Sequence, residues 1–106
     1  MKILDLPLKK EWYNMIEANI KTEEYREIKT YWCKRLLKYQ DTIESAVDFR
    51  DDYTHVRFRY GYTNRTMLRE IESITIDYGD PEWGAPTDKQ VFIIKFKKGG
   101  QDDNIG

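Results

Sequence analysis

Residues 55–79 read HVRFRYGYTNRTMLREIESITIDYG, and their pattern decides the fold class. Apolar and aromatic residues occupy every second position from Val56 to Tyr62, and Arg57 and Arg59 stand between them. This alternation predicts a strand with one face covered by the protein and the other in solvent. A β-sheet should therefore form the body of the fold.

A turn and two further strands follow in the chain. The sequence TNRT at 63–66 predicts the turn, and residues 67–79 predict a long strand. Its alternation shifts phase near Glu72 and Ser73, which indicates a β-bulge. Residues 90–98, QVFIIKFKK, are apolar on both faces in their middle. We therefore expect this last strand to be central in the sheet or covered on both sides.

The N-terminal part predicts a strand and then a helix. MKILDL at 1–6 alternates, and Pro7 should end this strand because proline cannot donate to a sheet ladder. Apolar residues then recur at helical spacing over 8–18. Asn19 stands where a helix end favours a left-handed residue.

The remaining segments predict one strand, one helix and three irregular stretches. Residues 21–28 alternate like a strand, and 30–40 show helical spacing. Residues 41–54 predict a loop, and 79–88, with two prolines and two glycines, predict a turn-rich loop. We expect 99–106 to be a disordered tail. The pattern indicates an α+β fold with a curved mixed sheet of about five or six strands and two short helices.

Composition limits the domain count and the partners. A chain of 106 residues with 40% hydrophobic and 14% aromatic residues should fold as one domain, which we place at 1–98. Its 18 basic and 19 acidic residues leave a net charge of −1. A protein that coats long stretches of nucleic-acid backbone needs many phosphate neutralisations, so any nucleic-acid contact here should come from a local site.

Several kinds of chemistry find no support in the residues. Cys33 is the only cysteine and His55 the only histidine, which argues against a disulfide, a structural zinc site and a catalytic triad. No glycine-rich phosphate loop follows a strand. We therefore expect no metal and no cofactor. No segment resembles a signal peptide or approaches membrane-spanning length, so we expect a cytoplasmic protein.

The polar stretch NIKTEEYRE at 19–27 has two interpretations. Its alternation places Thr22, Glu24 and Arg26 on one face, with Lys21 just after a helix end. A hydroxyl, a carboxylate and a guanidinium in register could bind a polar heterocycle, which offers donors and acceptors on each edge. On pattern alone, a solvated sheet face with cross-strand ion pairs is favoured.

This stretch resembles the signature of the ASCH (activating signal cointegrator homology) family, which reads Gly-x-Lys-x-x-Glu-x-Arg. Lys21, Glu24 and Arg26 stand at its three polar positions. Asn19 replaces the glycine, and asparagine visits the left-handed conformation more readily than most residues.

The resemblance covers about residues 1–97. VRFRYGY at 56–62 and GDPEWGA at 79–85 are similar to a later strand and loop of bacterial and phage ASCH proteins. It implies a PUA-like β-barrel, a small pseudo-barrel with helices beside it. It also implies a cleft in which the Lys, Glu and Arg gather.

The first functional hypothesis is a module that binds RNA or a nucleoside. Lys21 and Arg26 would hold phosphate or base oxygens, and Glu24 would accept from a base amino group. Trp83 is the preferred stacking residue because it lies in a Pro/Gly loop, and Trp12 is a further candidate. The expected ligand-binding residues are Lys21, Thr22, Glu24, Arg26, Tyr60 and Trp83.

Two alternatives stay open. Some ASCH proteins resemble acetylcytidine amidohydrolases with the motif Lys-Thr-x-Thr-x-Arg, whose second Thr is the nucleophile. Here Lys21 and Thr22 match but Glu24 takes the nucleophile position, and a carboxylate cannot simply replace an activated hydroxyl. Other members look like ribonucleases, for which Lys21 and Glu24 are the catalytic candidates. The second alternative is a protein-interaction module, which would need an exposed apolar patch.

Overall fold

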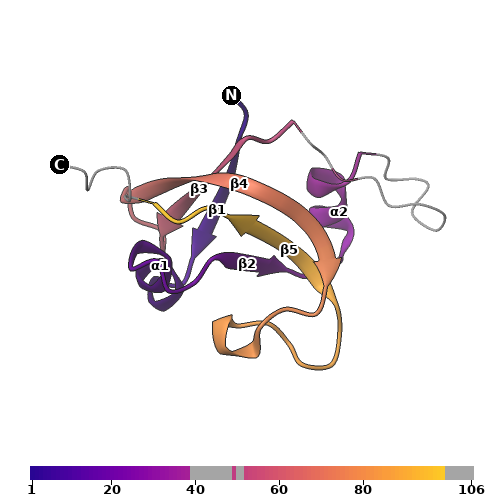
Figure 1. The fold of residues 1–106 in the computed structure, drawn as a ribbon. Coiled ribbons are helices and arrows are strands. Elements are labelled where there is room, and N and C mark those ends of the chain that lie inside the picture. The colour runs from indigo at the N-terminus through magenta and orange to yellow at the C-terminus, as the bar shows by residue number, and fades with distance from the viewer. Residues whose placement is uncertain (39–48, 50–51, 100–106) are drawn as a thin grey trace.

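A five-stranded mixed sheet organises the computed structural model, which describes residues 1–38, 49 and 52–99 (Figure 1). The strand order is β1-β3-β4-β5-β2; β1 runs parallel to β3, and every other neighbouring pair is antiparallel. The strands are β1 (Ile3–Leu8), β2 (Glu23–Arg26), β3 (His55–Tyr60), β4 (Thr66–Asp77) and β5 (Val91–Phe96).

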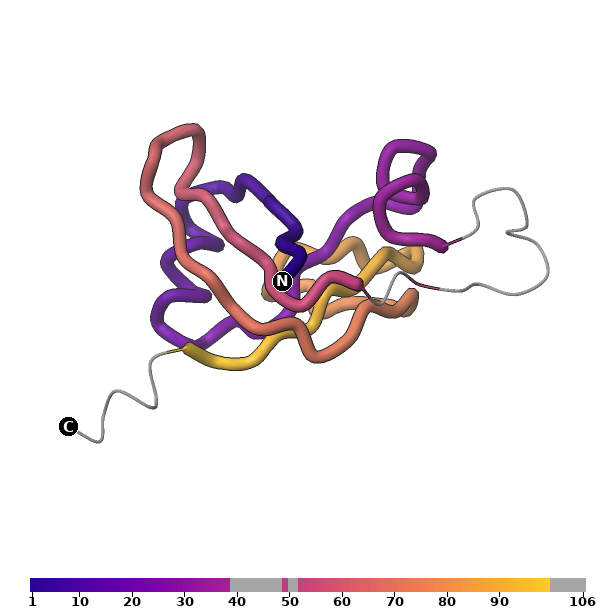
Figure 2. The backbone as a smooth tube through the Cα atoms, turned by 90° about the horizontal axis from the view of Figure 1, so that it is seen from above, coloured from indigo at the N-terminus to yellow at the C-terminus, as the bar shows by residue number. Residues whose placement is uncertain are grey.

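Two helices flank the sheet, and Figures 1 and 2 place them at its opposite ends. They are α1 (Lys10–Glu17) and α2 (Thr30–Leu36), and a short 3₁₀ helix (Pro81–Trp83) lies in the β4–β5 loop. The predicted α+β class, the strand number and the two helices are confirmed. The sheet does not close into a barrel, because β1 and β2 are its two edges and do not pair with each other.

The first strand continues through Pro7, which corrects the prediction that proline ends it. Pro7 lies in register with Arg59 of β3. Because β1 is an edge strand, the missing N–H can lie on the unpaired side and break no ladder hydrogen bond.

The long strands agree with the alternation in most details. A register irregularity lies between Ile71 and Ser73 of β4, as the phase shift predicts. Strand β5 lies between β4 and β2, which confirms its central position. Tyr62 was expected on the covered face of β3, but β3 ends at Tyr60 and the Tyr62 side chain is 96% exposed in the following turn.

Helix α1, strand β2 and helix α2 are shorter than predicted. Helix α1 begins at Lys10 because Lys9 keeps an extended backbone as its N-cap. Residues 39–48, 50–51 and 100–106 lie outside the described part of the chain, as do most of the predicted loop and tail.

Two hydrophobic clusters cover opposite faces of β5. Phe92, Ile94 and Phe96 join the larger cluster, whereas Val91 and Ile93 pack with Tyr25, Ala85 and Trp83. The β4–β5 loop therefore covers one sheet face and the larger cluster the other. Among the described residues, no helix is long and apolar enough to cross a membrane.

Candidate functional site

A cavity of about 470 Å³ lies between the two edges of the sheet, where the end of β1 approaches β2. Helix α1, helix α2 and the β4–β5 loop complete its wall. The lining residues are Pro7, Leu8, Lys9, Trp12, Glu24, Tyr25, Arg26, Glu27, Lys29, Trp32, Trp83 and Gly84. Its volume lies within the usual range of about 300–1,000 Å³ for small-molecule sites.

All three tryptophans of the chain line this cavity. Trp12 comes from α1, Trp32 from α2 and Trp83 from the end of the 3₁₀ helix. Each is only partly buried and packs on a hydrophobic cluster, so part of each indole stays open to the cavity. The site therefore offers flat aromatic surfaces from three separate elements.

Lys21 lies behind the cavity wall with only 1% of its surface exposed. Its Nζ donates to the backbone oxygen of Trp83 at 2.6 Å and pairs with Glu24 Oε1 at 3.0 Å. The ammonium also lies 4.9 Å from the ring centroids of both Trp12 and Tyr25. Burial lowers the Lys21 pKa, and the Glu24 carboxylate opposes that shift.

Glu24 joins the two cations of the site. Its exposed fraction is 5%, whereas Glu23 is half-buried and Glu27 exposed, as the alternation predicts. One carboxylate oxygen pairs with Lys21 and the other with Arg26 Nη1. One buried carboxylate therefore pairs with the positive charges of both Lys21 and Arg26.

Arg26 spans the gap between the two sheet edges. Nη1 donates to Glu24 and to the Tyr25 carbonyl at 2.9 Å, and Nη2 donates to the Pro7 carbonyl of β1 at 3.1 Å. The guanidinium also stacks near Trp32, 5.3 Å from the ring centroid. Of its five N–H groups, the Nε–H and one Nη2–H have no partner among the described residues, so they remain available to a ligand.

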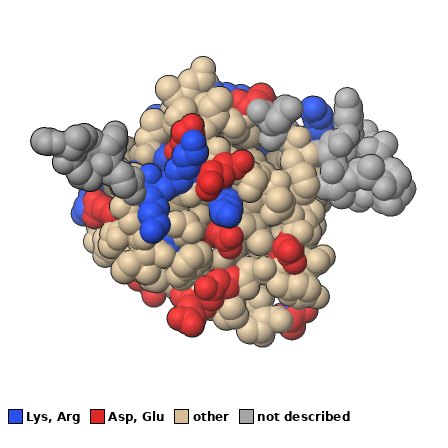
Figure 3. All heavy atoms as spheres, in the orientation of Figure 1, with Lys and Arg blue, Asp and Glu red and all other residues tan. Residues whose placement is uncertain are grey.

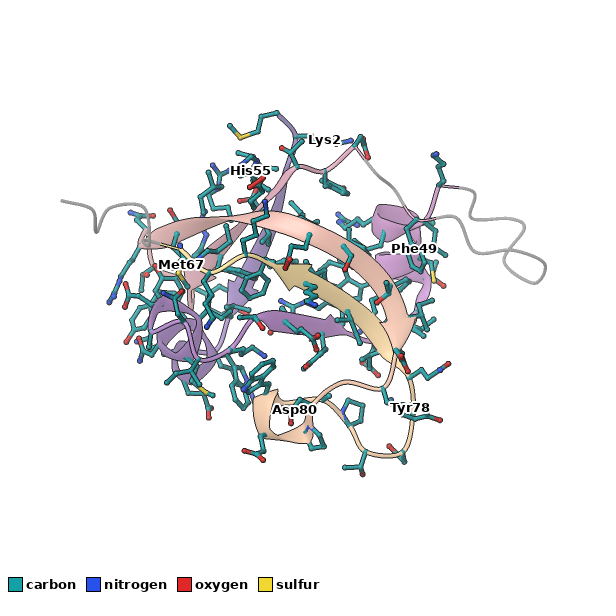
Figure 4. All side chains as sticks on the ribbon, in the orientation of Figure 1. Lys2, Phe49, His55, Met67, Tyr78 and Asp80 are labelled. Atoms are coloured by element: carbon teal, nitrogen blue, oxygen red, sulfur yellow. The ribbon has the colours of Figure 1, made fainter. Side chains whose placement is uncertain are left out.

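The β4–β5 loop is held against β2 by Tyr25. The Tyr25 hydroxyl donates to Glu23 Oε1 at 2.8 Å and accepts from the Asp80 backbone N–H at 3.0 Å. Figure 4 labels Asp80 in this loop, below β2. Burial raises the Tyr25 pKa above its ordinary value of 10.0.

Gly84 lets the loop approach Trp12. Its φ of +100° is left-handed, and an added Cβ would lie 3.1 Å from Trp12 Cζ2. A residue with a side chain would be strained there and would press on the indole. The glycine therefore helps to set the distance between the walls of Trp12 and Trp83.

The structure brings together four of the six predicted ligand-binding residues. Lys21, Glu24, Arg26 and Trp83 converge, although Lys21 does not itself line the cavity. Thr22 instead lines a separate shallow hollow with residues of β5. Tyr60 packs edge-to-face on Tyr13 with a centroid distance of 5.1 Å, away from this cavity.

The sequence patterns missed Trp32, Lys9 and Lys29 as lining residues. Trp32 forms part of the helical stripe of α2, which predicts core packing. Lys9 and Lys29 precede the two helices as their N-caps, and nothing in a single sequence distinguishes such lysines from ordinary surface residues. The presence of three tryptophans in a short chain was the available signal.

No group of three or more potential metal ligands occurs among residues 1–38, 49 and 52–99. His55 lies at the start of β3, and Figure 4 shows it at the opposite end of the molecule from the Asp80 loop. On the part of the surface in Figure 3 that described residues form, acidic and basic residues are interspersed.

Comparison of the chain with protein-family models, curated proteins and solved structures finds no match.

Proposed function

We propose that the chain is an ASCH-type module, with a PUA-like pseudo-barrel and a place in the cytoplasm, that binds a nucleoside unit, free or within RNA, in the tryptophan-lined cavity. The observation that carries this proposal is the convergence of Trp12, Trp32 and Trp83 on one cavity that the fixed guanidinium of Arg26 also lines. Flat indoles match the faces of a base, and guanidinium N–H groups match its oxygen and nitrogen acceptors.

Arg26 is the group that would contact the ligand. Its planar fork is already ordered by Glu24 and two backbone carbonyls, so little side-chain entropy is lost when the remaining N–H groups bind. Base oxygens and phosphate oxygens both accept from such donors. Arg26 therefore supplies orientation, and the indoles supply contact area.

Lys21 acts from behind as a positioning residue. It holds the Trp83 backbone and Glu24 while lying near the Trp12 ring. Because its Nζ is enclosed by these groups, it holds the stacking surface in place and pairs with the Glu24 carboxylate. This placement supports binding over hydrolysis, since a catalytic lysine would need to reach the substrate.

Quenching of tryptophan fluorescence by nucleosides and nucleoside 5′-monophosphates tests the proposal, because every tryptophan of the chain lines the cavity. Trp83→Ala should weaken binding by about 1–3 kcal/mol through loss of a stacking surface. Arg26→Lys should weaken it at least about tenfold, because lysine keeps the charge but not the planar fork.

Arg57→Lys is the matched control for the arginine. Arg57 pairs with Asp5 on the outer face of the sheet and does not line the cavity. The Arg57→Lys variant should bind nucleosides and nucleotides with the affinity of the wild type. The proposal fails if no nucleoside or nucleotide quenches the fluorescence, or if Arg26→Lys and Arg57→Lys behave alike. If the wild type releases acetate from N4-acetylcytidine and Lys21→Ala does not, the protein is a hydrolase rather than a binding module.

A further inference from the structure

A second hollow of about 520 Å³ adjoins the tryptophan-lined cavity. The two share a wall made of Pro7, Leu8 and Lys9. Gly61 and Tyr62 of the β3–β4 turn line the far side of the second hollow. The cavity and the second hollow therefore lie side by side at the end of β1.

Tyr62 is displayed on a well-ordered turn. Its side chain is 96% exposed, the largest exposed fraction among the large hydrophobic residues in the described part of the chain. The turn is tied to β1, since the Gly61 N–H donates to the Leu8 carbonyl at 2.9 Å. The φ of Gly61 is +58°, a left-handed value that favours glycine.

Hydrogen bonds inside the turn add to its order. Thr63 Oγ1 donates to the Tyr60 carbonyl at 2.7 Å, and Arg59 Nη1 donates to the Thr63 carbonyl at 3.1 Å. In Figure 2 the turn reaches beyond the end of β1. An aromatic ring exposed on an ordered turn adds nothing to the hydrophobic core. Because its backbone is already ordered, it can stack on a base with little further loss of entropy.

Lys9 stands on the wall between the two hollows. Its backbone is ordered as the N-cap of α1, and its carbonyl accepts from Trp12 and Tyr13. Its ammonium has no hydrogen-bond or ion-pair partner in the described part of the chain. Lys10 lies on the same side, with its Nζ 5.1 Å from the Tyr60 ring centroid. Glu11 is the one acidic residue among those lining the second hollow.

An aromatic surface, a basic wall and a second aromatic surface follow one another in space. We propose that the site takes single-stranded RNA, with one base in the tryptophan-lined cavity, the neighbouring base against Tyr62 and the linking phosphodiester at Lys9. Alternating stacking platforms and basic side chains are the features that hold single strands. This inference rests on the proposed function, because it assigns the first base to the same cavity.

The test compares a fluorescein-labelled pool of random hexaribonucleotides with the four nucleoside 5′-monophosphates. Tyr62→Ala should weaken hexamer binding at least about fivefold, the lower end of the stacking effect of one base, and leave mononucleotide binding unchanged. Tyr78→Ala is the control, because Tyr78 is also well exposed but lines neither the tryptophan-lined cavity nor the second hollow. Tyr78→Ala should bind both probes as the wild type does.

Lys9→Gln supplies a second readout that a structural effect would not produce. Loss of one phosphate contact should lower the slope of log affinity against log salt by about 0.7 for the single-stranded hexamer. Lys95→Gln is the matched control, since Lys95 is exposed on β5 and lines neither the tryptophan-lined cavity nor the second hollow. Its salt slope should match that of the wild type.

The outcomes separate the two proposals. If mononucleotides bind but Tyr62→Ala and Lys9→Gln leave hexamer affinity and its salt slope unchanged, the second subsite is refuted and the first cavity stands. If neither mononucleotides nor hexamers bind, both proposals fail. If the wild type self-associates in analytical ultracentrifugation and only Tyr62→Ala abolishes this, with hexamer binding unaffected, the turn is a protein contact and the inference is overturned.

Discussion

Strands β2 and β3 carry the same kind of pattern with opposite outcomes. Each places charged residues two positions apart on one face, and each presents an arginine to a carboxylate: Arg26 to Glu24, and Arg57 to Asp5. The Arg57 and Asp5 side chains are 40% and 53% exposed, whereas Glu24 is almost fully buried. The difference comes from what surrounds each pair, because Lys21 and Arg26 enclose Glu24, whereas solvent meets the outer face of β3.

Burial changes what such pairs contribute. Exposed ion pairs add little to stability because water and salt screen them. A buried pair is costly to break, because the remaining charge has no water around it. The β2 region should therefore respond strongly to substitutions that the β3 region tolerates.

The largest difference is expected for Glu24→Ala. This change leaves Lys21 and Arg26 facing each other without their shared carboxylate, and we expect it to lower the free energy of unfolding by about 3–5 kcal/mol. Urea denaturation measures the change. Glu24→Gln, which keeps the size and one acceptor, should cost less; equal stability of the wild type and Glu24→Ala would contradict the role of the buried carboxylate.

A glycine substitution beside each strand gives the next largest contrast. Gly84→Ala combines a left-handed φ with a Cβ 3.1 Å from Trp12, and should lower the free energy of unfolding by about 1–3 kcal/mol. Gly61→Ala shares the left-handed φ, but its nearest contact would be the flexible Lys10 side chain at 3.5 Å. Thermal unfolding should show the smaller loss for Gly61→Ala, and the reverse order would show that Gly84 does not hold the cavity wall.

Alkaline pH should weaken the β2 region through Tyr25. Its pKa is raised in the folded protein, so on unfolding the hydroxyl ionises near its ordinary value of 10.0. Above that pH the unfolded chain binds fewer protons than the folded one, and stability falls as pH rises. The lowered pKa of Lys21 makes stability rise with pH instead. A comparison of the wild type with Tyr25→Phe removes this contribution, because both proteins contain Lys21.

Urea midpoints from pH 8 to pH 11 would test this. The stability of the wild type relative to Tyr25→Phe should be constant below about pH 9 and then decline, because only the wild type carries the shifted hydroxyl. Parallel curves for the two proteins over the whole range would show that the pKa of Tyr25 is the same in the folded and unfolded states.

The smallest effect is expected at the exposed pair. Asp5→Asn removes the carboxylate that Arg57 contacts, and the arginine can then be hydrated. We expect a slight shift of the urea midpoint at low salt and none at 1 M salt, where the screening length is only about 3 Å. A loss as large as that of Glu24→Ala would mean that the two regions do not differ as described.

The predictability of the fold follows the same division. The alternation of β3, the apolar run of β5 and the phase shift in β4 all reflect local rules, and each appears in the structure. Asn19 has a φ of 60° at the end of the α1 segment, again as a local rule requires. Pro7 was misplaced because the edge position of β1 is decided by neighbours distant in sequence. Tyr62 was misplaced because the left-handed Gly61 begins a turn that the alternation alone does not reveal.

By itself, the sequence determined the strands, the helices and the grouping of Glu24 and Arg26 on one face of β2. Backbone sterics and side-chain alternation act over a few residues, so a single sequence carries them. Only the tertiary structure decided that this face is buried, that Lys21 is enclosed, and that three tryptophans from separate elements meet at one cavity. Those features depend on which segments fold over β2, and such contacts between distant residues leave no periodic trace in the chain.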